Sequence, residues 1–69
     1  MKLGEIRRRV REIRDDGVLD EEAAHSSEDA LWRDVLQAIA DRDHGDADPA
    51  VLAMAALKTT ELSFQRWCA

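Results

Sequence analysis

Apolar side chains recur at helical spacing from the start of the chain. Four of them lie three, four and three residues apart and form one stripe along a helix: Leu3, Ile6, Val10 and Ile13. The sequence therefore predicts a helix over residues 2–15. Gly17 follows two aspartates and suits the left-handed residue that ends many helices. We interpret the stripe as a wall of the core, with a dimer seam or a nucleic-acid-binding arm as alternatives.

A second pattern consists of apolar pairs that return every four residues. The pairs give a wide apolar face and predict a helix over residues 27–41: Leu31-Trp32, Val35-Leu36 and Ile39-Ala40. Ser26, with Asp29 three residues later, resembles a capping box and marks the expected start. Residues 18–27 then form a connector, which Val18 and Leu19 could anchor.

A third helix is predicted over residues 49–59. Asp48 offers an N-cap oxygen, and Pro49 suits the first helical position because its missing N–H has no helical partner there. The residues that follow are apolar on nearly every face of the helix, which predicts a position at the centre of the fold. The tail after it is expected to form either a short helical turn or an extended segment.

These patterns predict an all-α protein, a small three-helix bundle that forms one domain over residues 1–69. A chain of 69 residues with 45% hydrophobic residues and three aromatic ones builds a core worth only ~3–5 kcal/mol. Rossmann and barrel enzymes need longer chains. Cys68 is the only cysteine, and the longest apolar run is far too short for a membrane span. We expect a reduced, cytoplasmic protein with no membrane contact.

Charge is distributed unevenly along the chain. Residues 1–14 hold six basic and two acidic side chains, whereas residues 15–48 hold twelve acidic and two basic ones. The basic segment makes a nucleic-acid-associated regulator one alternative function, with phosphate contacts from Arg7, Arg8, Arg9 and Arg11. The acidic segment suggests another, a DNA-mimicking inhibitor whose surface includes Asp41, Asp43, Asp46 and Asp48.

Candidate reactive groups do not assemble into a known site. His25 and Glu28 share a helical face at a spacing that metal-binding bundles use, but the positions that face inward along the second helix are apolar, so we interpret them as a cap-region or surface pair. An acidic loop at residues 41–52 fails the calcium-loop pattern at its required glycine and glutamate positions. We therefore expect no enzymatic activity, no metal and no cofactor.

Binding through the C-terminal aromatic residues is the remaining expectation. Aromatic and arginine side chains carry much of the energy of protein interfaces, which makes the tail a candidate partner-binding site: Leu62, Phe64, Arg66 and Trp67. The alternative is that Phe64 and Trp67 fold back and complete a core that is short of aromatics. We expect a protein-binding or regulatory module that engages a protein partner or forms a homodimer.

Two segments within residues 20–69 also resemble a family of short uncharacterised proteins of actinobacteria and their phages. The first is His25-Ser26 with Glu28-Asp29, and the second is the terminal series Phe64, Arg66, Trp67, Cys68 and Ala69. The resemblance implies an origin in a phage or prophage. It implies no particular activity, so no catalytic residue is carried over.

Overall fold

The computed structural model describes residues 1–66, and within them it contains helices and no strand. Helix α1 spans Leu3–Leu19, α2 spans Glu21–Ala40 and α3 spans Pro49–Leu57, followed by one 3-10 turn, η1, over Lys58–Glu61. The all-α, three-helix bundle predicted from the sequence is confirmed. No helix of this part of the chain is long and apolar enough to cross a membrane.

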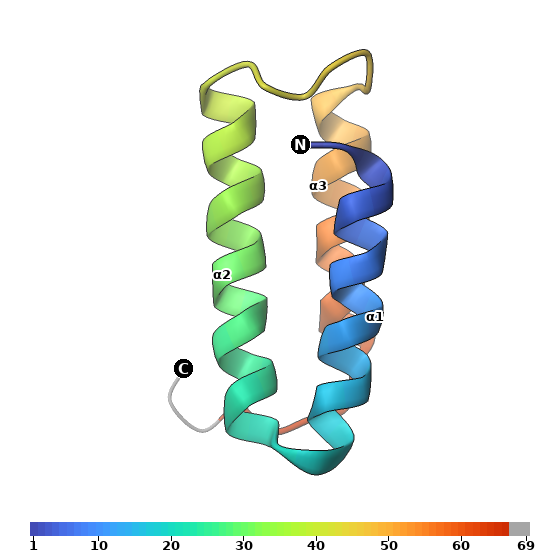
Figure 1. Cartoon of the computed structure of the whole chain (residues 1–69), viewed down its shortest axis with the longest axis vertical. Helices are drawn as coiled ribbons and strands as arrows, with labels where there is room; N and C mark the ends of the chain where they lie inside the picture. The colour runs from blue at the N-terminus through green and yellow to red at the C-terminus, as the bar shows by residue number, and fades with distance from the viewer. Residues whose placement is uncertain (67–69) are drawn as a thin grey trace.

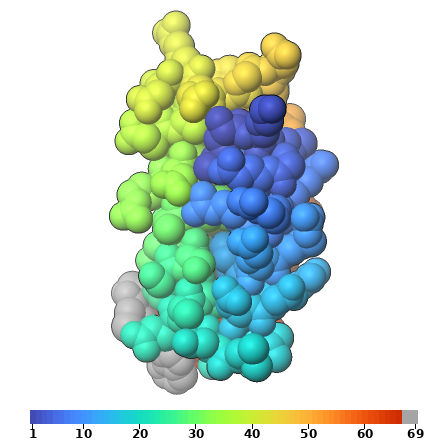
Figure 2. Space-filling view, in the orientation of Figure 1, coloured from blue at the N-terminus to red at the C-terminus, as the bar shows by residue number. Residues whose placement is uncertain are grey.

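The three helices lie nearly along one axis of a molecule that measures 35 × 19 × 14 Å. Figure 1 shows α1 and α2 as an antiparallel pair, with α3 returning beside α1 in the same direction as α1. On the face drawn in Figure 2, side chains of α1 and α2 meet along most of their length. This arrangement gives every helix two neighbours, and it leaves one side of each helix facing outward.

The core is formed by large apolar side chains from all three helices and from the segment after η1. Every one of the six is at most 7% exposed: Ile6, Ile13, Leu31, Val35, Leu52 and Phe64. Leu3 and Val10 are half-buried against this cluster, so the predicted apolar stripe of α1 does form a wall of the core.

The junction between α1 and α2 differs from the prediction. Gly17 does not end α1, because the helix continues to Leu19 and breaks only at Asp20. Asp20 has an extended backbone, and its carboxylate accepts a hydrogen bond from the Ala23 N–H at 3.0 Å, so Asp20 rather than Ser26 is the N-cap of α2. Residues 18–27 are thus almost entirely helical and not a connector.

The exposed end of α1 corrects a second expectation. Val18 and Leu19 anchor no connector, since they are 83% and 90% exposed in the last turn of the helix. Gly17, one position earlier, faces inward instead. A Cβ added to it would lie 3.2 Å from atoms of the Phe64 side chain, so the glycine permits a close approach rather than a left-handed turn.

Helix α3 begins as predicted and lies elsewhere than predicted. The Asp48 carboxylate accepts a hydrogen bond from the Ala50 N–H at 2.9 Å, with Pro49 at the first helical position. The helix is not the centre of the fold, because it has α1 and α2 on one side and no element of residues 1–66 on the other. Leu52 is fully buried, whereas Met54 is 67% exposed.

Candidate functional site

The outer side of α3 is an apolar surface that faces solvent. None of its nine residues carries a charge or a hydrogen-bonding side chain. Three large apolar side chains point outward from it, with Val51 42%, Met54 67% and Leu57 52% exposed. A helix that is apolar on all faces is ordinarily covered on all faces. Helix α3 is covered on one side only within residues 1–66.

A groove runs along each flank of α3. The α1/α3 groove has a volume of about 420 Å³ and combines an apolar floor with basic side chains, its lining being Leu3, Arg7, Val10, Arg11, Val51, Met54, Ala55 and Lys58. The α2/α3 groove is smaller, about 200 Å³, and its lining carries no charge: Trp32, Val35, Leu36, Ala53, Ala56 and Leu57. Met54 lines the α1/α3 groove and Leu57 lines the α2/α3 groove, so apolar side chains are exposed on both flanks of α3.

The four arginines predicted to contact nucleic acid do not share one surface. Arg8 lies 3.6 Å from Glu12 on α1, and Arg9 bridges to Asp34 of α2 at 2.9 Å. Arg7 and Arg11 line the α1/α3 groove instead. The structure therefore brings together two of the four, and it places them beside apolar side chains.

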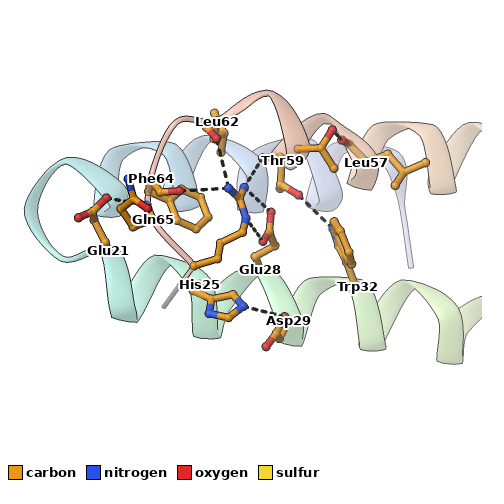
Figure 3. A network of polar contacts seen from close by, with 12 residues as sticks. Glu21, His25, Glu28, Asp29, Trp32, Leu57, Thr59, Leu62, Phe64 and Gln65 are labelled. Carbon is orange, nitrogen blue, oxygen red and sulfur yellow. Dashed lines mark hydrogen bonds and ion pairs between the residues drawn. The ribbon is translucent and has the colours of Figure 1, made fainter. Parts of the chain in front are cut away.

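After η1, residues 62–66 form an extended segment, here called the C-terminal strap, that crosses back over α2 (Figure 3). Arg66 donates two hydrogen bonds to the Glu28 carboxylate, at 2.8 and 3.0 Å, and further ones to the carbonyls of Thr59 and Phe64. Its guanidinium also stacks on the Phe64 ring, 4.1 Å from the ring centre. The Arg66 guanidinium thus joins the strap to α2 through Glu28 and to η1 through Thr59.

A second polar contact joins α2 to η1. The indole N–H of Trp32 donates to the Thr59 hydroxyl at 3.0 Å, and that hydroxyl donates to the Ala56 carbonyl at 3.2 Å. Thr59 is fully buried. Because no buried side-chain nitrogen or oxygen among the described residues lacks a hydrogen-bond partner, these groups stabilise the bundle instead of awaiting a ligand.

The Glu28 carboxyl is 2% exposed and ionised. Burial on its own raises the pKa of this carboxyl. Hydrogen bonds from Arg66, together with the nearby Thr59 hydroxyl and the charges of Arg66 and His25, outweigh that effect and hold the pKa below its ordinary value of 4.5. The hydrogen bonds to Glu28 raise the pKa of Arg66 in turn. The pair stays charged at neutral pH.

The surface role predicted for His25 and Glu28 is wrong. Both side chains are buried, because α2 starts six residues earlier than expected and these positions lie within the packed helix, with Glu28 facing Arg66 of the strap. The His25 Nε2 atom lies 3.5 Å from the Asp29 carboxylate. Across residues 1–66, no three His, Cys, Asp or Glu side chains gather as metal ligands would.

The predicted partner-binding residues of the tail are largely engaged within the chain. Phe64 is 7% exposed and packs in the core, as the folded-back alternative expects, and Arg66 is held by Glu28. Leu62 is half-buried. Trp67 lies outside the described residues. A role of this tail in binding a partner stays a prediction.

The acidic loop between α2 and α3 is solvated. Asp41, Asp43, Asp46 and Asp48 are all exposed, and the backbone turns at Arg42 and Gly45, which have φ values of 58° and 59°. Asp48 caps α3, while Asp41 accepts a hydrogen bond from Gln37 at 3.0 Å. The DNA-mimic alternative requires such exposed carboxylates but receives no further support from the loop.

The chain matches no protein-family model, no curated protein and no solved structure. The resemblance to short proteins of actinobacteria and their phages therefore stays a prediction, and so does the phage origin that it implies.

Sequence reasoning missed the importance of Glu28, Thr59 and the outer face of α3. The interior positions of Glu28 and Thr59 could be read only from partners far away in the chain. The uninterrupted apolar series of α3 is visible in the sequence, but the series alone predicts burial within the chain and does not reveal the exposed side.

Proposed function

We propose that this chain is a small protein-binding module that acts by contact of the outer side of α3 with another protein or with a second copy of itself. The observation that carries the proposal is α3 itself, a helix without one polar side chain that has one side open to solvent. Contiguous exposed apolar surface on a soluble protein ordinarily marks an interaction site.

The neighbouring helix extends the same surface. Leu36 of α2 is 67% exposed and lines the α2/α3 groove together with Leu57. A partner that covers Met54 and Leu57 of α3 can therefore also bury Leu36 of α2. Exposed side chains of this kind contribute little to the fold and much to an interface when they are covered.

Support for a nucleic-acid regulator is weaker. Arg8 and Arg9 are paired with carboxylates on the chain itself, and the remaining two arginines lie beside apolar side chains that phosphate does not cover favourably. Contact with another protein accounts for the apolar surface, whereas phosphate binding does not.

Photo-crosslinking tests the proposal directly. A benzophenone amino acid is placed at Met54, in the organism that encodes the chain and in the purified protein, and at Glu12 of the polar side of α1 as the matched control. We expect protein adducts, with a second copy or another protein, from position 54 and few from position 12. Equal adducts from both positions, or none from position 54, contradict the proposal.

Sedimentation velocity separates the two forms of the proposal. If the partner is a second copy, the wild-type chain associates with rising concentration, and replacing Met54 and Leu57 by serine keeps it monomeric. Because both side chains are more than half exposed, we expect the helical circular dichroism spectrum to be unchanged by these substitutions.

A further inference from the structure

The α1/α3 groove differs from the rest of the apolar surface in its charge. Three cations stand along it, Arg7 and Arg11 from α1 and Lys58 from the start of η1, and no carboxylate lines it. The whole chain nevertheless has a formal charge of −5. The groove is thus a local concentration of positive charge on an acidic protein.

The arginines of the groove are arranged at a cost to the helix. Arg7 and Arg11 are four residues apart on α1, a spacing at which like charges destabilise a helix by ~0.2–0.5 kcal/mol. Among the described residues neither has a carboxylate within ion-pair distance, whereas the other three arginines of α1 do: Arg8 with Glu12, Arg9 with Asp34 and Arg14 with Asp15. Lys58 has only the exposed Glu61, 3.6 Å away.

The floor of the groove has the dimensions of two helical turns. Leu3 and Val10 are seven residues apart on α1, and Val51 of α3 and Lys58 at the start of η1 are also seven residues apart, so each side extends over about 10 Å. Helices α1 and α3 run in the same direction (Figure 1), so the two sides of the groove follow each other along its length. A partner helix presents apolar side chains over that length at positions i, i+3 or i+4, and i+7.

We propose that the α1/α3 groove binds an acidic amphipathic helix of a partner protein. The apolar side chains of that helix lie on Leu3, Val10 and Val51, and its aspartates or glutamates pair with Arg7, Arg11 and Lys58. The inference rests on the proposed function and adds to it the site and the chemical class of the partner. Nucleic acid supplies the negative charge but no side chains for the apolar floor.

Fluorescence anisotropy on the full chain tests the groove with defined probes. The first is a labelled synthetic helix of about 15 residues. It carries leucine at positions i, i+4 and i+7, so that the leucines share one face, and glutamate at the other positions. The second has the same composition in scrambled order, the third has lysine for every glutamate, and the fourth is a labelled DNA duplex. At physiological salt we expect the first probe alone to bind the wild-type chain.

Charge reversal identifies the residues. In Arg7→Glu/Arg11→Glu, affinity for the glutamate helix is expected to fall by about tenfold or more, and binding of the lysine helix is expected to appear. That gain shows that the variant is folded. Arg8→Glu/Arg14→Glu is the matched control, because it changes the net charge equally on the same helix away from the groove, and we expect its affinity for the glutamate helix to fall by less than about threefold.

A variant of the apolar lining separates groove binding from attraction by charge alone. Met54→Ser leaves every cation in place, and we expect it to weaken binding of the glutamate helix by about fivefold or more. Equal binding of the scrambled helix, equal loss in both charge-reversed variants, preferential binding of DNA, or no binding of the glutamate helix each overturns the proposal. If crosslinks from position 54 persist in that last case, the groove assignment has failed while the protein-binding function stands.

Discussion

Replacing Arg66 by methionine removes the ion pair that fastens the C-terminal strap, together with the hydrogen bonds that Arg66 donates to the Thr59 and Phe64 carbonyls. Methionine keeps most of the length of the side chain and removes its charge. Glu28 is then left 2% exposed without the two hydrogen bonds that it accepts at 2.8 and 3.0 Å. Breaking a fully buried pair from one side costs ~3–5 kcal/mol.

The structure lowers that figure for this pair. The Arg66 side chain is 30% exposed, so water reaches the carboxylate more easily once the guanidinium is gone, and we expect a loss of ~2–3 kcal/mol at neutral pH. Against a total of ~3–5 kcal/mol for a core of this size, Arg66→Met removes about half of the free energy of unfolding. Urea unfolding, followed by circular dichroism at neutral pH, measures the loss.

The pH dependence of stability gives the sharper test, because the contribution of Glu28 changes with pH in opposite directions in the wild type and in Arg66→Met. In the wild type the pKa of Glu28 lies below its ordinary value of 4.5. The folded state therefore binds fewer protons than the unfolded one, and the contribution of Glu28 is present above that pH and lost as the pH falls. Without Arg66, burial raises the pKa of Glu28, and stability is then lost as the pH rises above the ordinary value.

The difference in stability between wild type and Arg66→Met is accordingly expected to be largest at about pH 7 and to shrink by more than ~1 kcal/mol at about pH 4. Arg8→Met is the control, since Arg8 is exposed beside Glu12 and its removal should cost less than ~0.5 kcal/mol at either pH. A difference between wild type and Arg66→Met that is the same at both pH values refutes the reasoning.

Three further substitutions test individual contacts, each by urea unfolding. Thr59→Val removes the hydroxyl that accepts the Trp32 indole N–H and should cost ~1–2 kcal/mol; no loss means that the bond is not maintained. Asp20→Ala removes the N-cap of α2 and should cost ~1 kcal/mol, whereas Ser26→Ala should cost less. Gly17→Ala should gain less than the ~1 kcal/mol of helix propensity, because its Cβ meets the Cβ and ring of Phe64 at 3.2 Å, and a full gain would contradict this close approach.

Features set by neighbouring residues could be predicted from the sequence. The N-cap at Asp48 and the apolar stripe of α1 depend on residues within one or two turns, and both were found as expected. The boundary between α1 and α2 depends on a competition between Gly17 and Asp20. The close approach of Phe64 to Gly17 involves a residue far along the chain, so no local pattern could show it.

The candidate site was harder to predict for the same reason. Glu28 is separated from Arg66 by 38 positions, and its place in a polar series suggested the surface. The apolar series of α3 was recognised, but nothing local to it indicates how many of its sides the chain itself can cover. A bundle of three helices covers only the side that faces its two neighbours, which turns a predicted core helix into a candidate interface.

The single residue that separates α1 from α2 has a consequence for how the molecule assembles. Since only Asp20 lies between the two helices, they can pair as soon as each has formed, with almost no chain to close. Formation of the ion pair between Glu28 and Arg66 must instead close a much longer loop. Closing that loop is slower and costs more conformational entropy. We expect the helical hairpin to form first and the strap to dock onto it last, and to be the first part to detach when the protein unfolds.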